Sequence, residues 1–180
     1  MRKLCITFLI LTIIALSGYV KYTQNLQSTN TQVLRIHIRA DSNESDDQQV
    51  KYKVKDAVVE FLTPKLVLCD TKSKAEKTIQ NLLPEIQTVC DKVLTDNGYE
   101  YKSKAKLNVE QFPTRVYGGL TLQQGYYDAL IIELGSGSGD NWWCVVYPPL
   151  CFTGEGKNYV YKSKIKQIIN DFYEKQKGVK

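Results

Sequence analysis

The stretch Asn141-Trp-Trp-Cys-Val-Val-Tyr-Pro-Pro-Leu-Cys-Phe152 is the least generic part of this chain. It contains both tryptophans, two of the five cysteines and a Pro-Pro pair. Trp142 to Tyr147 is aromatic and β-branched, which predicts a short strand. Pro148-Pro149 must end that strand, because proline fixes φ and donates no ladder hydrogen bond. Cys144 and Cys151 are therefore expected to face each other across a rigid turn.

Two more strands are predicted on the N-terminal side of this stretch. Ala129 to Leu134 is a continuous apolar run, typical of a strand buried on both faces. Gly135 to Asp140 would connect it to the tryptophan strand, most simply as a hairpin loop. Apolar and polar residues alternate from Ala105 to Val109, which predicts another strand. Between the two, Phe112 to Tyr127 is the most irregular segment, with one proline and three glycines.

Another alternating segment, Val33 to Arg39, lies near the start of the folded part. A strand directs successive side chains to opposite faces, so one set is expected to meet the core and the other to meet solvent. The apolar set is Leu34, Ile36 and Ile38, and the basic set is Arg35, His37 and Arg39. The pattern predicts a half-buried strand with a basic outer face.

Two helices are predicted between the first and second strands. The first begins at Ser45, which forms a capping box with the glutamine three residues later, and ends before Pro64. The second begins at Ser73 and ends at Gly98. Pro84 lies inside it and should kink it, because proline removes one backbone hydrogen bond.

These elements predict an α+β domain over residues 33–155. The expected architecture is a mixed or antiparallel sheet of about four strands with helices packed on one face. Residues 156–180 would add a basic C-terminal helix, from about Tyr161 to Lys175. Its lysines could lie on an anionic membrane surface, although a solvated face is the simpler interpretation.

Residues 1–20 have the pattern of an export signal. Two basic residues precede an apolar run from Leu4 to about Leu16, and small residues follow, as in a secretory signal peptide. The run can also be counted through Val20, near the lower limit of about 17 residues for a membrane span. An uncleaved N-terminal anchor is therefore the alternative. Residues 21–32 read as a polar linker, and in either case the remaining chain is expected outside the cytoplasm.

The composition is that of a globular protein. A chain of 180 residues with a hydrophobic fraction of 43% suffices for one packed domain and a leader. The formal net charge of +5 is too mild to indicate a nucleic-acid partner.

Three separated motifs resemble those of a known family. RIHIRADSN at Arg35–Asn43, FPTRVYG at Phe112–Gly118 and NWWCVVYPPLC at Asn141–Cys151 are similar, in sequence and order, to stage II sporulation protein R of endospore-forming bacteria. The resemblance runs from about Val33 to Phe152. Two positions depart from the usual pattern, since Asp41 replaces an asparagine and Lys55 replaces an arginine.

The resemblance implies a secreted signal rather than an enzyme, and no cofactor. Made in the forespore, it would act between the forespore and mother-cell membranes. There it would trigger a membrane-embedded aspartic protease of the mother-cell membrane, which processes the precursor of the mother-cell sigma factor. If the leader stays uncleaved, the N-terminal segment would also contact a membrane.

Exposed aromatic and arginine side chains dominate binding hot spots, and such residues occur in the irregular and strand-edge segments of this chain. Of the two tryptophans, we expect one to be buried and one to be available. The expected partner-binding residues are Arg39, Asp41, Ser42, Asn43, Phe112, Pro113, Thr114, Arg115, Tyr117, Gly118, Trp142 and Trp143.

The cysteines allow two interpretations. Outside the cytoplasm, Cys144 and Cys151 are candidates for a disulfide, and the alternative is two buried thiols beside a proline turn. Cys69 and Cys90 are expected at opposite ends of the second helix, too far apart to bridge. Both are therefore expected to be core thiols.

Two other classes of function remain open, a cell-envelope binding module with an aromatic cleft and a secreted Cys/His thiol enzyme. The enzyme would need His37, the only histidine, to reach Cys144 or Cys151, and nothing in the sequence indicates that geometry.

Metal sites are disfavoured. Asp41 to Asp47 lacks the glycine and the closing glutamate of a calcium loop, and the cysteines lack zinc-ligand spacing. The glycine-rich loop at 135–139 lacks the lysine and helix of a phosphate-binding loop.

Overall fold

The computed structural model describes residues 10, 12–13, 32–117, 120–152 and 162–177. The predicted leader and linker lie almost entirely outside the described residues. Within the described part, no helix has both the length and the apolar character needed to cross a membrane. The elements are β1 (Leu34–Arg39), α2 (Ser45–Leu66), α3 (Lys72–Asn81), α4 (Leu83–Asp96), β2 (Ser103–Phe112), β3 (Arg115–Tyr117), β4 (Leu120–Leu122), β5 (Gly125–Leu134), β6 (Asn141–Tyr147), the 3-10 turn η1 (Leu150–Phe152) and α5 (Lys162–Lys177).

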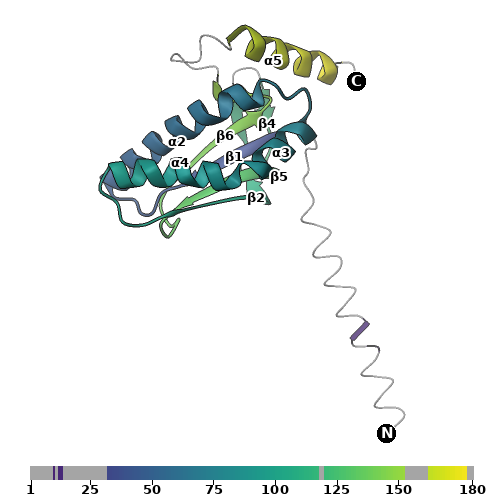
Figure 1. The fold of residues 1–180 in the computed structure, drawn as a ribbon. Helices are drawn as coiled ribbons and strands as arrows, with labels where there is room; N and C mark the ends of the chain where they lie inside the picture. The colour runs from purple at the N-terminus through teal and green to yellow at the C-terminus, as the bar shows by residue number, and fades with distance from the viewer. Residues whose placement is uncertain (1–9, 11, 14–31, 118–119, 153–161, 178–180) are drawn as a thin grey trace.

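The main sheet has the strand order β2-β5-β1-β6. β1 runs parallel to β5 and antiparallel to β6, and β2 runs antiparallel to β5, so the sheet is mixed. Helices α2, α3 and α4 cover one face, and α5 lies across one end of the domain (Figure 1). The predicted α+β class, with a four-stranded mixed sheet and an added C-terminal helix, is confirmed.

The predicted hairpin between β5 and β6 is wrong. β1 lies between these two strands and pairs with both, so the loop at residues 135–140 passes over the end of β1. A short glycine-rich connection is compatible with either path. The sequence of the loop therefore did not reveal whether β6 would pair with β5 or with β1.

β1 is buried on both faces, whereas its alternation predicted a basic face in solvent. The exposed fractions of Arg35 and His37 are 0% and 5%. The separate hairpin formed by β3 and β4 lies over this second face together with Phe172 of α5, and their apolar side chains form a second core with Val33 and Ala129. Alternation separated the two faces correctly, but it did not show that both would be covered.

The helix boundaries differ from the predictions at both internal prolines. α2 continues through Pro64 to Leu66. The predicted single second helix is two helices, because Pro84 stands in the first turn of α4, where a missing backbone N–H leaves no bond unmade. Thr71 caps α3 by accepting from Lys74 N at 3.2 Å, not Ser73. Gly98, with φ of +83°, follows the end of α4 as predicted.

The predicted capping box at Ser45 is also absent. Glu44 occupies the N-cap position of α2 and makes no side-chain capping bond. The hydroxyl of Ser42 organises this turn instead, since it accepts from Glu44 N at 3.1 Å and donates to Asp47 Oδ2 at 2.5 Å. The start of α2 is therefore tied to the turn that follows β1.

That turn is in contact with the loop before β6. Asp41 Oδ1 accepts from Ser136 N at 2.5 Å, and Asn43 Oδ1 accepts from Asp140 N at 2.6 Å. Gly139 N donates to Ala40 O at 2.9 Å. The two turns approach so closely that a Cβ atom on Gly139 would lie 2.2 Å from Ser42 O. Ser42 O is a backbone atom, so it could not rotate away as a flexible side chain would. Glycine is thus required here for space.

We expect Gly139→Ala to lower the free energy of unfolding by about 1 to 3 kcal/mol, as overpacking against fixed backbone usually does. Gly98→Ala is the matched control, because a Cβ atom there meets no atom within 4 Å. This substitution costs only the strain of the left-handed backbone conformation, about 1 kcal/mol. Urea unfolding measures both variants. If Gly139→Ala proves no less stable than Gly98→Ala, the close packing of the two turns is wrong.

Candidate partner-binding surface

A network of polar side chains lies on the face of the sheet opposite α2 and α4. His37 Nδ1 lies 2.6 Å from Glu110 Oε2, and His37 Nε2 lies 2.6 Å from Asn141 Oδ1. Arg39 donates to Glu133 Oε1 at 2.9 Å and also pairs with Glu110. The four strands place these groups together, since β1 contributes His37 and Arg39, whereas β2, β5 and β6 contribute the acceptors Glu110, Glu133 and Asn141. The network joins all four strands through side chains.

Glu110 is the centre of this network because it bonds both His37 and Arg39. Burial raises the pKa of its carboxyl, but the hydrogen bond from His37 and the nearby His37, Arg39 and Lys106 outweigh burial and hold the pKa below its ordinary value. Glu110 is therefore a carboxylate at neutral pH, and its charge is balanced within the network.

Aromatic and arginine side chains border the network. The Arg115 guanidinium lies 4.7 Å from the ring centroid of Trp143, which in turn lies 5.5 Å from the His37 ring. Arg115 and its neighbour Thr114 are exposed, and Trp143 is half-buried. We call this region the polar sheet face, and it comprises His37, Arg39, Glu110, Arg115, Glu133, Asn141 and Trp143.

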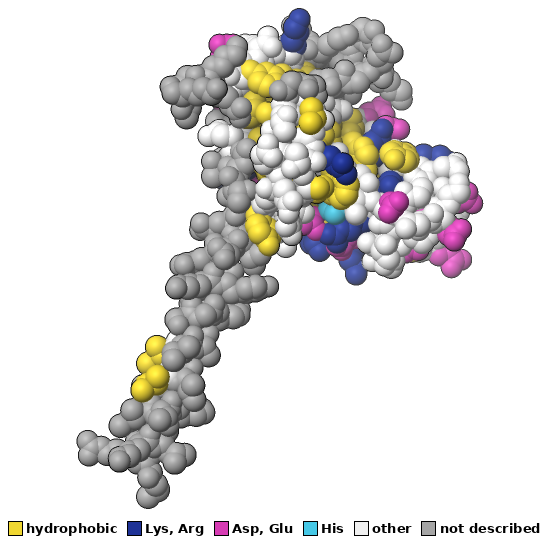
Figure 2. All heavy atoms as spheres, turned by 180° about the vertical axis from the view of Figure 1, so that it is seen from behind, with side chains coloured by type: hydrophobic (Ala, Val, Ile, Leu, Met, Phe, Trp, Pro, Cys, Tyr) yellow, Lys and Arg dark blue, Asp and Glu magenta, His cyan; other side chains and the backbone are white. Residues whose placement is uncertain are grey.

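Figure 2 shows the molecule from this side. The one histidine, in cyan, lies among basic and acidic side chains and next to hydrophobic ones. Such a mixture of aromatic groups with planar cation donors is typical of binding hot spots.

The structure distributes the predicted partner-binding residues over several places. Arg39, Thr114, Arg115 and Trp143 lie together on or beside the polar sheet face, and Pro113 is exposed beside them. Phe112 is fully buried with its ring 5.8 Å from that of His37, so its side chain supports the face from beneath. Tyr117 is half-buried, and Gly118 lies outside the described residues.

The other predicted residues lie elsewhere. The turn Asp41 to Asn43 is at one end of the sheet, where its side chains hold the loop before β6. Asparagine, which the resemblance noted above suggests as the usual residue at position 41, has the same Oδ1 acceptor, so either residue could make this contact. Trp142 is on the helix side, 5.9 Å from Lys55 Nζ. The two tryptophans lie on opposite faces as predicted, but both are half-buried, rather than one being buried and one available.

Sequence reasoning missed the acceptors of the network. Glu110, Glu133 and Asn141 were not among the predicted site residues, and His37 was considered only as a possible base. One signal was present in the sequence, since Glu133 is the one charged residue in the otherwise apolar run from Ala129 to Leu134. A carboxylate at such a position needs a buried or half-buried cation as partner.

The thiol pair lies on the other side of the sheet from the histidine. Register pairs Ile36 with Cys144 and His37 with Trp143, so the side chains of His37 and Cys144 point to opposite faces. Cys144 and Cys151 both pack with the core beneath the helices. The geometry therefore does not assemble a Cys/His dyad, and the described residues contain no cluster of three or more His, Cys, Asp or Glu able to hold a metal ion.

The structure holds Cys144 and Cys151 as free thiols next to each other. Cys151 Sγ donates to Val145 O at 2.8 Å. A hydrogen bond from Cys151 lowers the pKa of Cys144, whereas burial raises the pKa of Cys151. Cys69 and Cys90 are buried thiols as predicted, but Cys69 follows α2 and Cys90 is within α4, so they do not bound one helix.

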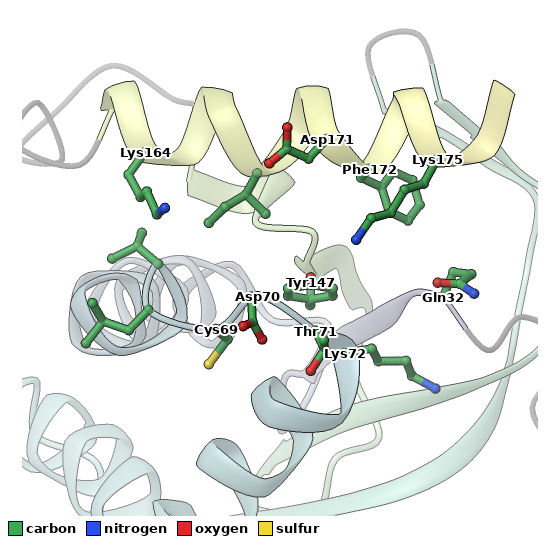
Figure 3. A pocket seen from close by; sticks show the side chains of 13 residues that line it. Gln32, Cys69, Asp70, Thr71, Lys72, Tyr147, Lys164, Asp171, Phe172 and Lys175 are labelled. Carbon is green, nitrogen blue, oxygen red and sulfur yellow. The ribbon is translucent and has the colours of Figure 1, made fainter. Parts of the chain in front are cut away.

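A cavity of about 440 Å³ lies between α5 and the segment that joins α2 to α3. Lys164 and Lys175 extend from α5 into this cavity, and Asp70 of the joining segment and Lys72 at the start of α3 lie on its opposite side (Figure 3). Leu68, with an exposed fraction of 80%, is part of its wall. The cavity has cations, carboxylates and apolar groups, but none of them converges on one point with a matching set of acceptors or donors.

The fold and the polar sheet face define an α+β domain with a charged and aromatic surface on one side of its sheet. A family model for stage II sporulation protein R matches residues 30–157. Stage II sporulation protein R of Bacillus subtilis (strain 168) is 34% identical over 155 residues, which cover 83% of this chain and 69% of that protein. This chain therefore belongs to the stage II sporulation protein R family, and membership implies a role in sporulation signalling. No solved structure matches the chain.

The pH dependence of stability tests the network. A carboxyl whose pKa is lower in the folded than in the unfolded protein stabilises the fold above its unfolded value, here about 4.5, and this stabilisation is lost as the pH falls through the folded value. We expect Glu110→Gln to lower the free energy of unfolding by roughly 1 to 3 kcal/mol at about pH 7. The difference from the parent should shrink below about pH 4.5.

Urea unfolding at a series of pH values measures this difference. Glu100→Gln is the control, because Glu100 is exposed and should match the parent throughout. A Glu110→Gln deficit that stays constant down to low pH would contradict a charged, paired Glu110.

Proposed function

We propose that this protein is an extracytoplasmic signal of endospore formation, secreted from the forespore. It acts between the two membranes, where it triggers a membrane-embedded aspartic protease that processes the mother-cell sigma-factor precursor. The observation that carries the proposal is the family match, which spans every element from β1 to η1. The proposal gives the domain a binding role and no catalytic one.

The polar sheet face supports this role. Its carboxylates are already paired with Arg39, His37 and Lys106, whereas the Arg115 guanidinium lies over the Trp143 ring and forms no ion pair within the described residues. An exposed guanidinium stacked on an indole is preorganised for a planar acceptor on a partner. The proposed contact therefore centres on Arg115 and Trp143, with Arg39 and Thr114 beside them.

Binding would act on the protease by differential affinity. A bound domain shifts an equilibrium between inactive and active protease only as far as it prefers the active form. Secretion or an N-terminal anchor would both place the domain on the outer side of the mother-cell membrane. The contact with the protease is then limited to its extracytoplasmic segments.

Reconstitution in a host that does not sporulate tests the proposal. The candidate protease and the sigma-factor precursor are produced with and without this chain bearing its own leader. Processing that needs the exported chain supports the proposal. If the chain is exported and folded but processing is unchanged, the direct-activator role fails.

Within that system, we expect Arg115→Ala to reduce processing by about tenfold or more, as removal of a hot-spot arginine does. Its melting temperature should stay within about 4 °C of the parent, because an exposed cation–π pair contributes only about 0.5 to 1 kcal/mol. Lys77→Ala is the control, since Lys77 is an exposed cation on α3 over the opposite sheet face. A large loss of stability in Arg115→Ala would make this arginine structural instead.

We also propose that Cys144 and Cys151 form a disulfide after export, because the two thiols are neighbours and the compartment is oxidising. Closing a loop of about eight residues stabilises by about 2.5 kcal/mol on the loop-entropy formula. The Cys144→Ser and Cys151→Ser variants should each have a free energy of unfolding lower than that of the exported parent by about this amount. A reductant should lower the free energy of unfolding of the exported parent to that of the variants, and it should leave the stability of the variants unchanged. Free thiols in the exported parent, detected by mass spectrometry, would contradict the bridge.

A cell-envelope binding module is the second candidate function, and the cavity under α5 favours it. The family model ends at residue 157, before α5 begins, so this cavity is partly built from residues outside the matched region. An exported, folded chain that fails to stimulate processing would make this candidate the leading one.

A further inference from the structure

Arg35 of β1 is a fully buried cation that has no carboxylate partner among the described residues. Its exposed fraction is 0%, and none of the ion pairs among the described residues includes it. Nη2 donates to Tyr117 Oη at 2.8 Å, whereas Nε and Nη1 have no hydrogen-bond partner. Buried polar groups in native proteins are nearly always paired, so an unpaired one requires an explanation.

Three aromatic rings surround this guanidinium. Its Cζ atom lies 4.1 Å from the ring centroid of Phe112, 4.9 Å from that of Tyr127 and 5.7 Å from that of Tyr117. Ring faces attract a cation, which explains how Arg35 is tolerated. They provide no acceptor for the N–H groups of Nε and Nη1, and the loss of hydration of these groups stays uncompensated.

A second buried cation shows the contrast. Lys51, with an exposed fraction of 1%, donates to Gln48 Oε1 at 2.5 Å and to Asp140 O at 3.0 Å. The fold therefore satisfies the buried cation of α2 with two oxygen acceptors and leaves that of β1 with one. The missing acceptors are specific to the Arg35 site.

The roof of the Arg35 site is the β3–β4 hairpin. Its two strands form a sheet of their own that does not join the main sheet, and isolated two-stranded hairpins are only marginally stable. The hairpin rests on the domain through Tyr117, Leu120 and Leu122. The same hairpin carries Arg115, which is exposed with its guanidinium over the Trp143 ring, and Val116, which has an exposed fraction of 65%. A partner that engages Arg115 therefore contacts the element that covers Arg35.

We infer that Arg35 is a receptor for a carboxylate of the protein partner, reached when the partner displaces Tyr117 and the β3–β4 hairpin. A carboxylate in the place of the Tyr117 hydroxyl would accept from Nη2 and Nε along one edge of the guanidinium plane, a strong bidentate pairing. This inference rests on the proposed function and names the chemistry of the contact, an Asp or Glu side chain or a chain-terminal carboxylate on an extracytoplasmic segment.

A carboxylate fits this site better than a phosphate. One guanidinium within an apolar and aromatic cage balances a single negative charge, whereas the second charge of a phosphate would stay buried and unpaired. The nearby carboxylates Glu110 and Glu133 already bind other cations. The surrounding face thus has no spare anion of its own to offer Arg35.

The test compares Arg35→Met with Lys51→Met in the exported, purified chain and in the reconstituted processing system. Methionine fills a similar volume without a charge, and replacing an uncompensated buried charge by an apolar group is often neutral or stabilising. We expect the melting temperature of Arg35→Met to equal or exceed that of the parent. Lys51→Met should lower it by about 4 °C or more, because two acceptors lose their donor.

In the processing system, Arg35→Met should lower the affinity of the chain for the protease by about thirtyfold or more, as loss of one partner of a buried charge pair does. Arg35→Lys should retain part of the activity, because an ammonium still pairs with a carboxylate as a point charge. This pattern of a stable but inactive Met variant and a partly active Lys variant is not expected of a residue that only supports the core.

Three results would overturn the inference or its basis. A melting temperature of Arg35→Met well below that of the parent would make Arg35 a structural group, held by its rings or by bound water. A stable Arg35→Met chain with parental activity would refute the role of Arg35 as a carboxylate receptor, but it would not affect the proposed function. Absence of processing with the parent chain would refute the proposed function itself, and the inference with it.

Discussion

The burial of β1 between two covered faces is the constraint on which the rest of this structure depends. The strand pairs with β5 on one side and β6 on the other, so its backbone is fully engaged. One set of its side chains packs under the helices, and the other set is basic. Once the β3–β4 hairpin and α5 cover the second face, each basic side chain needs a partner, because burying a bare charge is costly.

The three basic side chains of β1 meet that requirement in different ways. His37 and Arg39 share Glu110, and Arg39 also reaches Glu133, so the side chains in the middle and at the end of the strand have carboxylate partners. Arg35 lies deepest and has rings and one tyrosine hydroxyl. Along this single strand, ion pairs are replaced by an aromatic cage around a cation, and the guanidinium that lacks acceptors lies beneath the separate two-stranded β3–β4 sheet. A fold that tolerates a buried group without hydrogen-bond acceptors is expected to use that group in its function.

The candidate surface was only partly predictable from the sequence. Arg115 and Trp143 stand out as an arginine and an indole in exposed segments, and the structure brings them together. Phe112 carries the same signal but is fully buried, because aromatic residues serve cores as well as interfaces. The acceptors Glu110 and Asn141 gave little signal, since they become partners of His37 only when β2, β1 and β6 are placed in one sheet.

The sequence by itself determined the local structure and the family of this protein. Apolar alternation, a mostly apolar run and a glycine after a helix specify β1, β5 and the end of α4, because their causes are local to a few residues. The tertiary structure alone decided that β1 lies between β5 and β6, that its basic face is covered, and that His37 and Cys144 point to opposite sides. Alternation states which side chains share a face, but what covers that face depends on pairing between segments far apart in the chain.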